Sequence, residues 1–243
     1  MQTKIFAHRG ASADRAENTM EAFKLSMKHG ADGVELNVHS TKDGHIVIIH
    51  DLTVDRVSTG RGIVSDFTLD ELKRHSFSKL CPSQDLCPIL TLEELYSILA
   101  ENTAFMVNVE LKTMERQYPF MPEKLIQMES RHDMSGRVIY SSFNHHTLKT
   151  IKELSPESEI GLLYDNNMVE PWEYAKRMNA MAIHPNINAI KANPEIVEKC
   201  HENGIKVNVW TVDEPTDIEA MMKLGVDGIM TRKPNIAYFL RDD

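Results

Sequence analysis

Short apolar runs alternate with longer amphipathic segments from one end of the sequence to the other. A short run bounded by polar residues is typical of a buried β-strand, and a longer segment with apolar residues three and four apart is typical of a helix. The predicted strands span residues 4–7, 33–38, 105–111, 137–141, 159–162, 181–183, 205–210 and 227–230. The predicted helices span residues 18–29, 91–100, 122–131, 144–153, 170–178, 191–202, 215–223 and 234–240. Eight strand–helix pairs predict the α/β class, with a parallel sheet closed into a (β/α)8 or TIM barrel.

Residues at the predicted helix ends support these boundaries. Thr91 and Glu94 have the spacing of a capping box, in which each side chain binds the backbone of the other. Pro215 and Pro234 stand where a first helical turn tolerates proline. Gly30 follows the first predicted helix and is suited to end it.

The length of the chain fits a single barrel. It has 243 residues, and a (β/α)8 barrel commonly takes about 250 in one domain, so we predict one domain over residues 1–243. The 42% share of hydrophobic residues supports a packed core and excludes a disordered acidic chain. The formal net charge of -9 argues against a nucleic-acid-binding protein, because such proteins usually carry a basic face. An anionic substrate remains compatible, since a few local cations can dominate inside a cleft.

One apolar run does not fit the alternation. Residues 46–49 follow the predicted strand 33–38 after a short connection that contains Asp43 and Gly44. A parallel crossover needs about a dozen residues or more, whereas a hairpin needs only a few. We therefore predict that this run is antiparallel to its predecessor. It would belong to a small insertion after the second strand, at about residues 40–90.

Cysteine content and hydropathy bear on the location of the protein. Three cysteines, Cys81, Cys87 and Cys200, cannot all pair within one chain, and their spacing matches no common zinc motif. Thiols in a reducing compartment are therefore expected. The first residues lack the apolar stretch of a signal peptide, and no apolar run approaches the ~18 residues of a membrane-spanning helix. We predict a cytoplasmic protein with no stable membrane anchor, and the sequence leaves its oligomeric state open.

Acidic and amide side chains stand at the carboxyl ends of two predicted strands, where (β/α)8 barrels carry their chemistry. Glu35 and Asn37 are two residues apart and share one face of their strand, and Glu110 follows on the next barrel strand. Two carboxylates in one barrel mouth repel each other, unless one is protonated or a cation lies between them. Oxygen ligands of this kind suit Mg²⁺ or Ca²⁺, so the pattern indicates a divalent-cation site.

Basic and aromatic residues stand at the same predicted face. His8 and His50 could act as an acid/base pair near neutral pH. Arg9 and Lys112 could hold a phosphate, Arg9 through a bidentate fork and Lys112 as a point charge. Trp210, at the end of the seventh predicted strand, is by itself more typical of packing at the rim.

A structural interpretation competes with each of these roles. Arg9 could simply bridge to Glu35, and Lys112 to Glu110. A single histidine at a strand end is structural more often than not, and the remaining histidines of the chain are interpreted as structural or solvated. The convergence of the whole set on one face of the barrel favours a functional site over separate structural roles.

Long motifs of the sequence resemble the glycerophosphodiester phosphodiesterase family. The first are AHRGASADRAENTMEAF (7–23) and GADGVELNVHSTKDGHIVIIHD (30–51). The resemblance continues through PILTLEEL (88–95), VNVELK (107–112), SSFN (141–144), VNVWTVD (207–213) and GVDGIMTRKP (225–234). It therefore covers nearly the whole chain, and the ordered combination of motifs is specific.

The resemblance implies a (β/α)8 barrel with a small insertion after the second strand. It also implies hydrolysis of glycerophosphodiesters to glycerol 3-phosphate and an alcohol, by attack of water or of the substrate's own 2-hydroxyl group. The implied roles are acid/base catalysis for His8 and His50, cation binding for Glu35 and Glu110, phosphate contact for Arg9 and Lys112, and a wall at the glycerol side for Trp210. Within the matching Glu17-Asn18-Thr19, Asn18 is expected to cap the first helix.

One position departs from the family pattern. Where the family usually has aspartate, as a second metal carboxylate, this chain has Asn37. Asparagine keeps a neutral carbonyl oxygen that can bind Mg²⁺ or Ca²⁺, but it removes a negative charge. We therefore expect Asn37 to complete the metal site with Glu35 and Glu110, and to bind the cation more weakly than aspartate would.

Two other functions remain compatible with the sequence. A phospholipase-type phosphodiesterase could use the same barrel, although the insertion lacks the aromatic cluster expected for a membrane surface. A non-catalytic phosphodiester-binding protein would explain Asn37 as a sign of lost catalysis. Turnover of glycerophosphocholine with added metal separates this second alternative from the enzyme.

Overall fold

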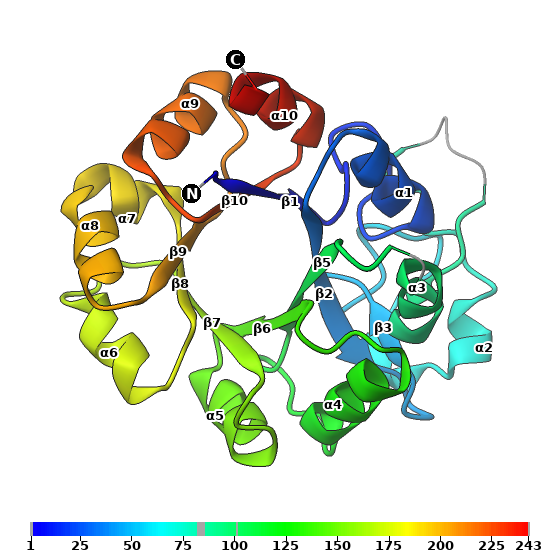
Figure 1. Cartoon of the computed structure of the whole chain (residues 1–243). Helices are drawn as coiled ribbons and strands as arrows, with labels where there is room; N and C mark the ends of the chain where they lie inside the picture. The colour runs from blue at the N-terminus through cyan, green and yellow to red at the C-terminus, as the bar shows by residue number, and fades with distance from the viewer. Residues whose placement is uncertain (1, 82–85, 101, 243) are drawn as a thin grey trace.

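Eight parallel strands close into a barrel in the part of the chain described by the computed structural model, residues 2–81, 86–100 and 102–242. In order around the barrel they are β1 (Lys4–His8), β2 (Gly33–Ser40), β5 (Met106–Leu111), β6 (Val138–Ser142), β7 (Glu159–Tyr164), β8 (Ala182–Pro185), β9 (Lys206–Val209) and β10 (Gly228–Thr231). The sheet closes because β1 pairs with both β2 and β10. Figure 1 shows the resulting ring of strands, and the predicted (β/α)8 barrel is confirmed.

Helices surround the ring on its outer side (Figure 1). They are α1 (Met20–Lys28), α3 (Leu92–Leu99), α4 (Met121–Arg131), α5 (His145–Leu154), α6 (Pro171–Arg177), α7 (Ile187–Ala192), α8 (Glu195–Glu202), α9 (Pro215–Leu224) and α10 (Pro234–Asp242). The prediction of one helix over residues 191–202 is wrong, because Pro194 separates α7 from α8. Proline disfavours the helical conformation at the preceding residue, and Asn193 accordingly leaves it, with ψ 73°. Within the described ranges, no helix is long and apolar enough to span a membrane.

The predicted helix signals are found at their positions. Thr91 and Glu94 form the expected capping box at α3, and Pro215 and Pro234 open α9 and α10. The backbone at Gly30, just after α1, has φ 75°, a left-handed conformation that glycine adopts at little cost.

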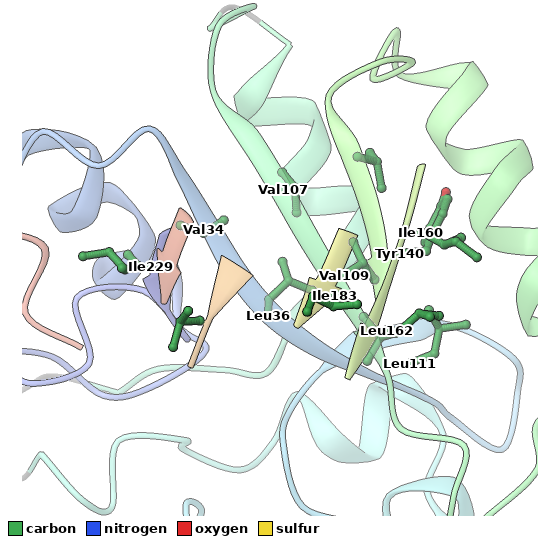
Figure 2. Close-up of a cluster of buried hydrophobic side chains, with 14 of the residues drawn as sticks. Val34, Leu36, Val107, Val109, Leu111, Tyr140, Ile160, Leu162, Ile183 and Ile229 are labelled. Carbon is green, nitrogen blue, oxygen red and sulfur yellow. The ribbon is translucent and has the colours of Figure 1, made fainter. Parts of the chain in front are cut away.

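Alternation along the strands separates the core from the site. In β2, Val34 and Leu36 join the apolar layer between strands and helices, together with Val107 and Val109 of β5 (Figure 2). Successive side chains of a strand point to opposite faces, so the residues between them face the barrel interior. Burial of each of these apolar side chains contributes about 1.5–3 kcal/mol to the stability of the fold. This packing fixes the strands, and so keeps the inward-facing polar residues in register.

The segment between β2 and β5 departs from the barrel repeat. It contains β3 (Ile46–Ile48), the short 3-10 helix η1 (Val64–Asp66), α2 (Leu69–Leu72) and β4 (Leu90–Thr91), followed by α3. β3 runs antiparallel to β2, as predicted for residues 46–49, and pairs with β4. A small apolar cluster of its own, which includes Val47, Ile49 and Val54, holds this segment together. Residues 82–85 of the predicted insertion lie outside the described residues.

Candidate active site

The carboxyl ends of β1, β2 and β5 bring most of the predicted site residues together. The strand register places Asn37 of β2 directly beside Glu110 of β5, and His8 of β1 beside Glu35 of β2. His50 follows β3 and reaches the same end of the barrel, because β3 lies antiparallel along β2. The predicted convergence therefore holds for residues from four different strands or strand ends.

The amide of Asn37 lies between the two carboxylates. Its Nδ2 donates to Glu35 Oε1 and to Glu110 Oε2, at 2.7 Å in each case. All three side chains are buried, and Asn37 is fully so. The carboxylates thus converge on one point, which a hydrogen-bond donor occupies.

Asn18 holds the other end of this amide. The prediction that Asn18 caps the first helix is wrong: Thr19 is the N-cap, and its side chain accepts from the backbone N–H of Ala22. Asn18 instead has φ 57° and is buried, and its Nδ2 donates to Asn37 Oδ1 at 3.0 Å. The left-handed backbone, which asparagine tolerates, turns the side chain inward instead of along the helix.

Electrostatics at the carboxylates favours a positive charge. Burial, and then the neighbouring Glu110, raise the pKa of Glu35 above its usual range, while Arg9 opposes the shift. Such a shift means that the ionised carboxylate is costly here, which is the situation that a cation relieves. The donor set of two carboxylates and one amide fits a hard divalent cation.

This site has two acidic side chains, Glu35 and Glu110, where a site with aspartate at position 37 would have three. Among the residues described, no group of three or more His, Cys, Asp or Glu side chains could hold a metal ion. The third position belongs to Asn37, whose Nδ2 faces the carboxylates. The residues present fit a cation through Glu35 and Glu110, and Asn37 could contribute its oxygen only in another orientation.

His50 is held on both sides of its ring. Its Nδ1 lies 2.7 Å from Asp51 Oδ1, and its Nε2 lies 3.3 Å from Lys112 Nζ. Since Lys112 donates, Nε2 is the accepting nitrogen and Nδ1 carries the proton toward Asp51. Burial and then the cation of Arg9 lower the pKa of His50, which keeps the ring neutral.

His39 is a neighbour that the sequence pattern did not single out. It is buried, and its Nε2 lies 3.2 Å from the backbone oxygen of His50, while its Nδ1 lies 2.6 Å from Tyr118 Oη. Burial lowers the pKa of His39 to about 4, so the ring stays neutral and supports the backbone at His50. The structural role expected for it is consistent with these contacts.

His8 has fewer contacts. Its Nε2 lies 3.7 Å from Glu35 Oε2, which is too long for a hydrogen bond, and its buried Nδ1 has no partner among the described residues. Burial and then Arg9 lower the pKa of His8 well below its ordinary value. The ring is therefore available for a hydrogen bond to a bound molecule.

Arg9 and Lys112 each form an ion pair with a carboxylate. Arg9 does not bridge to Glu35 through its guanidinium: its Nη1 pairs with Glu17 Oε1 at 3.0 Å, and only its backbone N–H donates to Glu35. Lys112 does pair with Glu110, Nζ to Oε1 at 3.1 Å. The structural pairing considered for Lys112 is thus present, beside its contact with His50.

Arg56 is a site residue that sequence reasoning missed. It donates to both oxygens of Glu17 at 2.8 and 2.9 Å, and to both oxygens of Asp51 at 2.6 and 3.0 Å. Glu17 in turn holds Arg9, and Asp51 holds His50. Arg56 therefore connects the predicted phosphate-binding arginine to the predicted acid/base histidine. The motif spacing carried no signal for it, because its two partners come from separate loops.

A cavity of about 610 Å³ opens beside His50 and Asp51. Its polar wall includes His50, Glu110 and Lys112, and its apolar wall includes Met114 and Phe143. Trp210 meets Phe143 edge to face at 5.6 Å and is anchored by its Nε1, which donates to the backbone oxygen of His184. The aromatic pair thus lies next to the cavity that Phe143 and Glu110 line.

Comparisons with known proteins identify the family that the chain resembles over nearly its whole length. A model described as the "Glycerophosphoryl diester phosphodiesterase family" matches residues 8–236. A glycerophosphodiester phosphodiesterase of Caldanaerobacter subterraneus subsp. tengcongensis is 46% identical over 239 residues, with 96% of each chain covered.

Solved structures show the same architecture. A glycerophosphodiester phosphodiesterase from Parabacteroides distasonis is 28% identical with a TM-score of 0.84, covering 99% of this chain and 97% of its own. A phosphodiesterase from Oleispira antarctica, in complex with the product sn-glycerol-3-phosphate, has a TM-score of 0.89 over 100% of this chain and 98% of its own. It is 22% identical, so this second likeness shows the fold alone.

Proposed function

The chain belongs to the glycerophosphoryl diester phosphodiesterase family, and we propose that it hydrolyses glycerophosphodiesters to glycerol 3-phosphate and an alcohol. The observation that carries the proposal is the convergence of Glu35, Glu110 and His50 at the barrel mouth, where Glu110 and His50 line a cavity. A small anionic diester would enter there. We propose that residues 1–243 act as one domain, located in the cytoplasm, since three cysteines cannot all pair within one chain.

The proposed cofactor is Mg²⁺ or Ca²⁺, held by Glu35, Glu110 and the amide oxygen of Asn37. When bound, it would neutralise charge on the phosphate oxygens as a Lewis acid. Glu35 and Glu110 are suited to this because both are buried and both point at one position. Burial of the pair makes cation binding favourable, since it relieves their mutual repulsion.

His50 is the proposed general base. Asp51 accepts the Nδ1 proton of His50, so Nε2 carries the lone pair; it now accepts from Lys112 Nζ at the cavity wall and would be released when Lys112 turns to the phosphate. The Nε2 atom would take the proton of the attacking hydroxyl as its oxygen bonds to phosphorus. His8, at the end of β1, would protonate the leaving alcohol oxygen as its bond to phosphorus breaks. Burial, and then the cation of Arg9, lower the pKa of His8, and the charge of the bound anionic diester would offset the second of these causes and favour the protonated ring.

Three residues are proposed to bind the substrate. Arg9 would hold a phosphate oxygen from the side of β1, and Lys112 would do so from the side of His50. Trp210 would border the glycerol group, as its position next to Phe143 at the mouth supports. Preorganised cations of this kind stabilise charge that develops in the transition state.

The decisive experiment compares two substrates with different leaving groups. On sn-glycero-3-phosphocholine, His8→Ala and His50→Ala should each lower kcat by about 10²-fold or more. On the p-nitrophenyl diester of glycerol 3-phosphate, whose leaving group needs no proton, His8→Ala should recover most of its rate and His50→Ala should not. Near-unchanged rates in either variant on the choline diester would contradict the assignment. Binding of this diester by the wild-type protein without turnover would indicate a non-catalytic binder, and a preference for phospholipid vesicles would indicate a phospholipase.

A further inference from the structure

The two asparagines behind the carboxylates form a closed hydrogen-bonded unit. The Nδ2 of Asn37 donates both of its protons, one to Glu35 and one to Glu110, and its Oδ1 accepts from Asn18 Nδ2. The remaining atom of the pair, Asn18 Oδ1, is buried and has no hydrogen-bond partner in the described part of the chain. An amide oxygen without a donor is costly inside a protein, so its presence calls for a physical reason.

The orientation of Asn37 conflicts with cation binding. An amide nitrogen carries no lone pair for a metal, so only Oδ1 of Asn37 can act as a ligand. That atom now points away from the carboxylates, toward Asn18. To reach a cation between Glu35 and Glu110, the amide must turn by half a rotation about its last side-chain bond, which is a soft torsion. Its Nδ2 would then face Nδ2 of Asn18, donor against donor.

We propose that the amides of Asn18 and Asn37 rotate together when a divalent cation binds. Asn37 then turns Oδ1 to the cation, and Asn18 turns its now unpartnered Oδ1 to accept from Asn37 Nδ2. The proposal rests on the proposed function, because the cation belongs to that site. It assigns Asn18 as a positioning residue for the metal ligand.

The surroundings of Asn18 restrict its motion to this rotation. Its backbone N–H donates to the carbonyl of Arg9 at 2.9 Å, and its φ of 57° is a conformation that suits asparagine, aspartate and glycine. The side chain is 5% exposed and so cannot swing out to solvent. Rotation of Asn18 breaks the present hydrogen bond from its Nδ2 to Asn37 Oδ1, a cost that would weaken cation binding in this chain.

Asn18→Asp is the matched test of this cost. Aspartate suits the left-handed backbone and offers only acceptors, so it would receive Asn37 Nδ2 in the rotated state. The added charge by itself would raise cation affinity, and the same change in an Asn37→Asp background measures that contribution. In that background position 37 has no amide that could turn toward the cation. We expect the affinity gain for Ca²⁺ to be about tenfold larger with Asn37 than with Asp at this position, a difference of about 1.4 kcal/mol. Equal gains in the two backgrounds would overturn the proposal.

The side-chain amide resonances of the wild-type protein give a second readout. In a Ca²⁺ titration by ¹H–¹⁵N NMR, the NH₂ signals of Asn18 and Asn37 should change together, with the midpoint found by calorimetry. A change confined to Asn37 would overturn the coupled rotation while leaving the metal site intact. No Ca²⁺ binding at all, or binding unaffected by Glu110→Gln, would overturn both. Loss of diester turnover with intact binding and rotation would count against the proposed activity alone.

Discussion

The side-chain nitrogen of Asn37 lies 2.7 Å from Oε2 of Glu110, its register partner on the neighbouring strand. The same nitrogen meets Glu35, so one amide satisfies two buried carboxylates. In a site with aspartate at this position, three carboxylates would face one another and would depend on a cation. The amide therefore makes the cation-free site of this protein less unfavourable, which reduces the gain in free energy on metal binding.

Asn37→Asp should consequently tighten binding of Ca²⁺ and Mg²⁺, because it adds a charge and removes the competing donor. We expect the dissociation constant to fall by about tenfold or more, measured by calorimetry, since one charged hydrogen bond is worth about 1.5–3 kcal/mol. The control is Asn188→Asp, which adds the same charge at an exposed position of α7. Unchanged affinity in Asn37→Asp would contradict this account.

Removal of divalent cations should abolish hydrolysis of sn-glycero-3-phosphocholine. The buried Glu35 and Glu110 would then repel the anionic diester instead of binding it through a cation. After chelation with EDTA and dialysis, added Mg²⁺ or Ca²⁺ should restore the rate in the wild-type protein but not in Glu110→Gln. Chelator-resistant turnover would reject the metal site.

Arg56→Ala should impair the enzyme although Arg56 lies behind the groups that meet the substrate. Loss of its bonds releases Glu17 and Asp51, which orient Arg9 and His50. A displacement of about 1 Å at such groups can cost about 10²-fold, so kcat/KM should fall by that order.

The kinetic pattern distinguishes this positioning role of Arg56 from a general loss of structure. KM should rise through Arg9 and kcat should fall through His50, while the melting temperature changes little. Arg56→Lys should restore part of the rate, because an ammonium group can meet one carboxylate but lacks the fork. Arg61→Ala, at an exposed position of the same segment, should behave as wild type. A fall in melting temperature with unchanged kinetics of the folded fraction would show a structural role only.

His184 should make stability depend on pH. It lies fully buried in the barrel, and burial lowers its pKa to about 3, against about 6.5 in an unfolded chain. As the pH falls below about 6.5, His184 binds a proton in the unfolded chain but not in the folded protein. The contribution of His184 to stability is therefore fully present above this pH and is lost progressively toward pH 3. The slope approaches about 1.4 kcal/mol per pH unit.

Urea unfolding of His184→Gln at two pH values isolates this contribution. Between pH 7 and about pH 5, wild type should lose about 2 kcal/mol more than the variant. His146→Gln removes an exposed histidine and should keep the wild-type slope. Parallel pH profiles of wild type and His184→Gln would exclude the effect.

The sequence predicted the barrel through features that each segment carries alone. The alternation of Val34 and Leu36 with Glu35 and Asn37 already assigns one face of β2 to the core and the other to the interior. The short connection that contains Asp43 and Gly44 predicted the antiparallel β3, because a parallel crossover needs about a dozen residues or more. Predictions failed where a second interaction outweighed a local preference. Asn18 is a good capping residue, but its left-handed backbone and its bond to Asn37 leave the cap to Thr19.

The sequence by itself thus determined the strands, the end of the barrel that carries polar residues, and the unusual asparagine among the acidic side chains. These follow from periodicity and residue type, which are local properties. Only the tertiary structure decided which atom of Asn37 faces Glu35 and Glu110, and that Arg56 joins Glu17 to Asp51. Such contacts depend on strand register and on loops from distant parts of the chain. Their physical basis is the pairing of buried charges and donors, which exists only after the barrel closes.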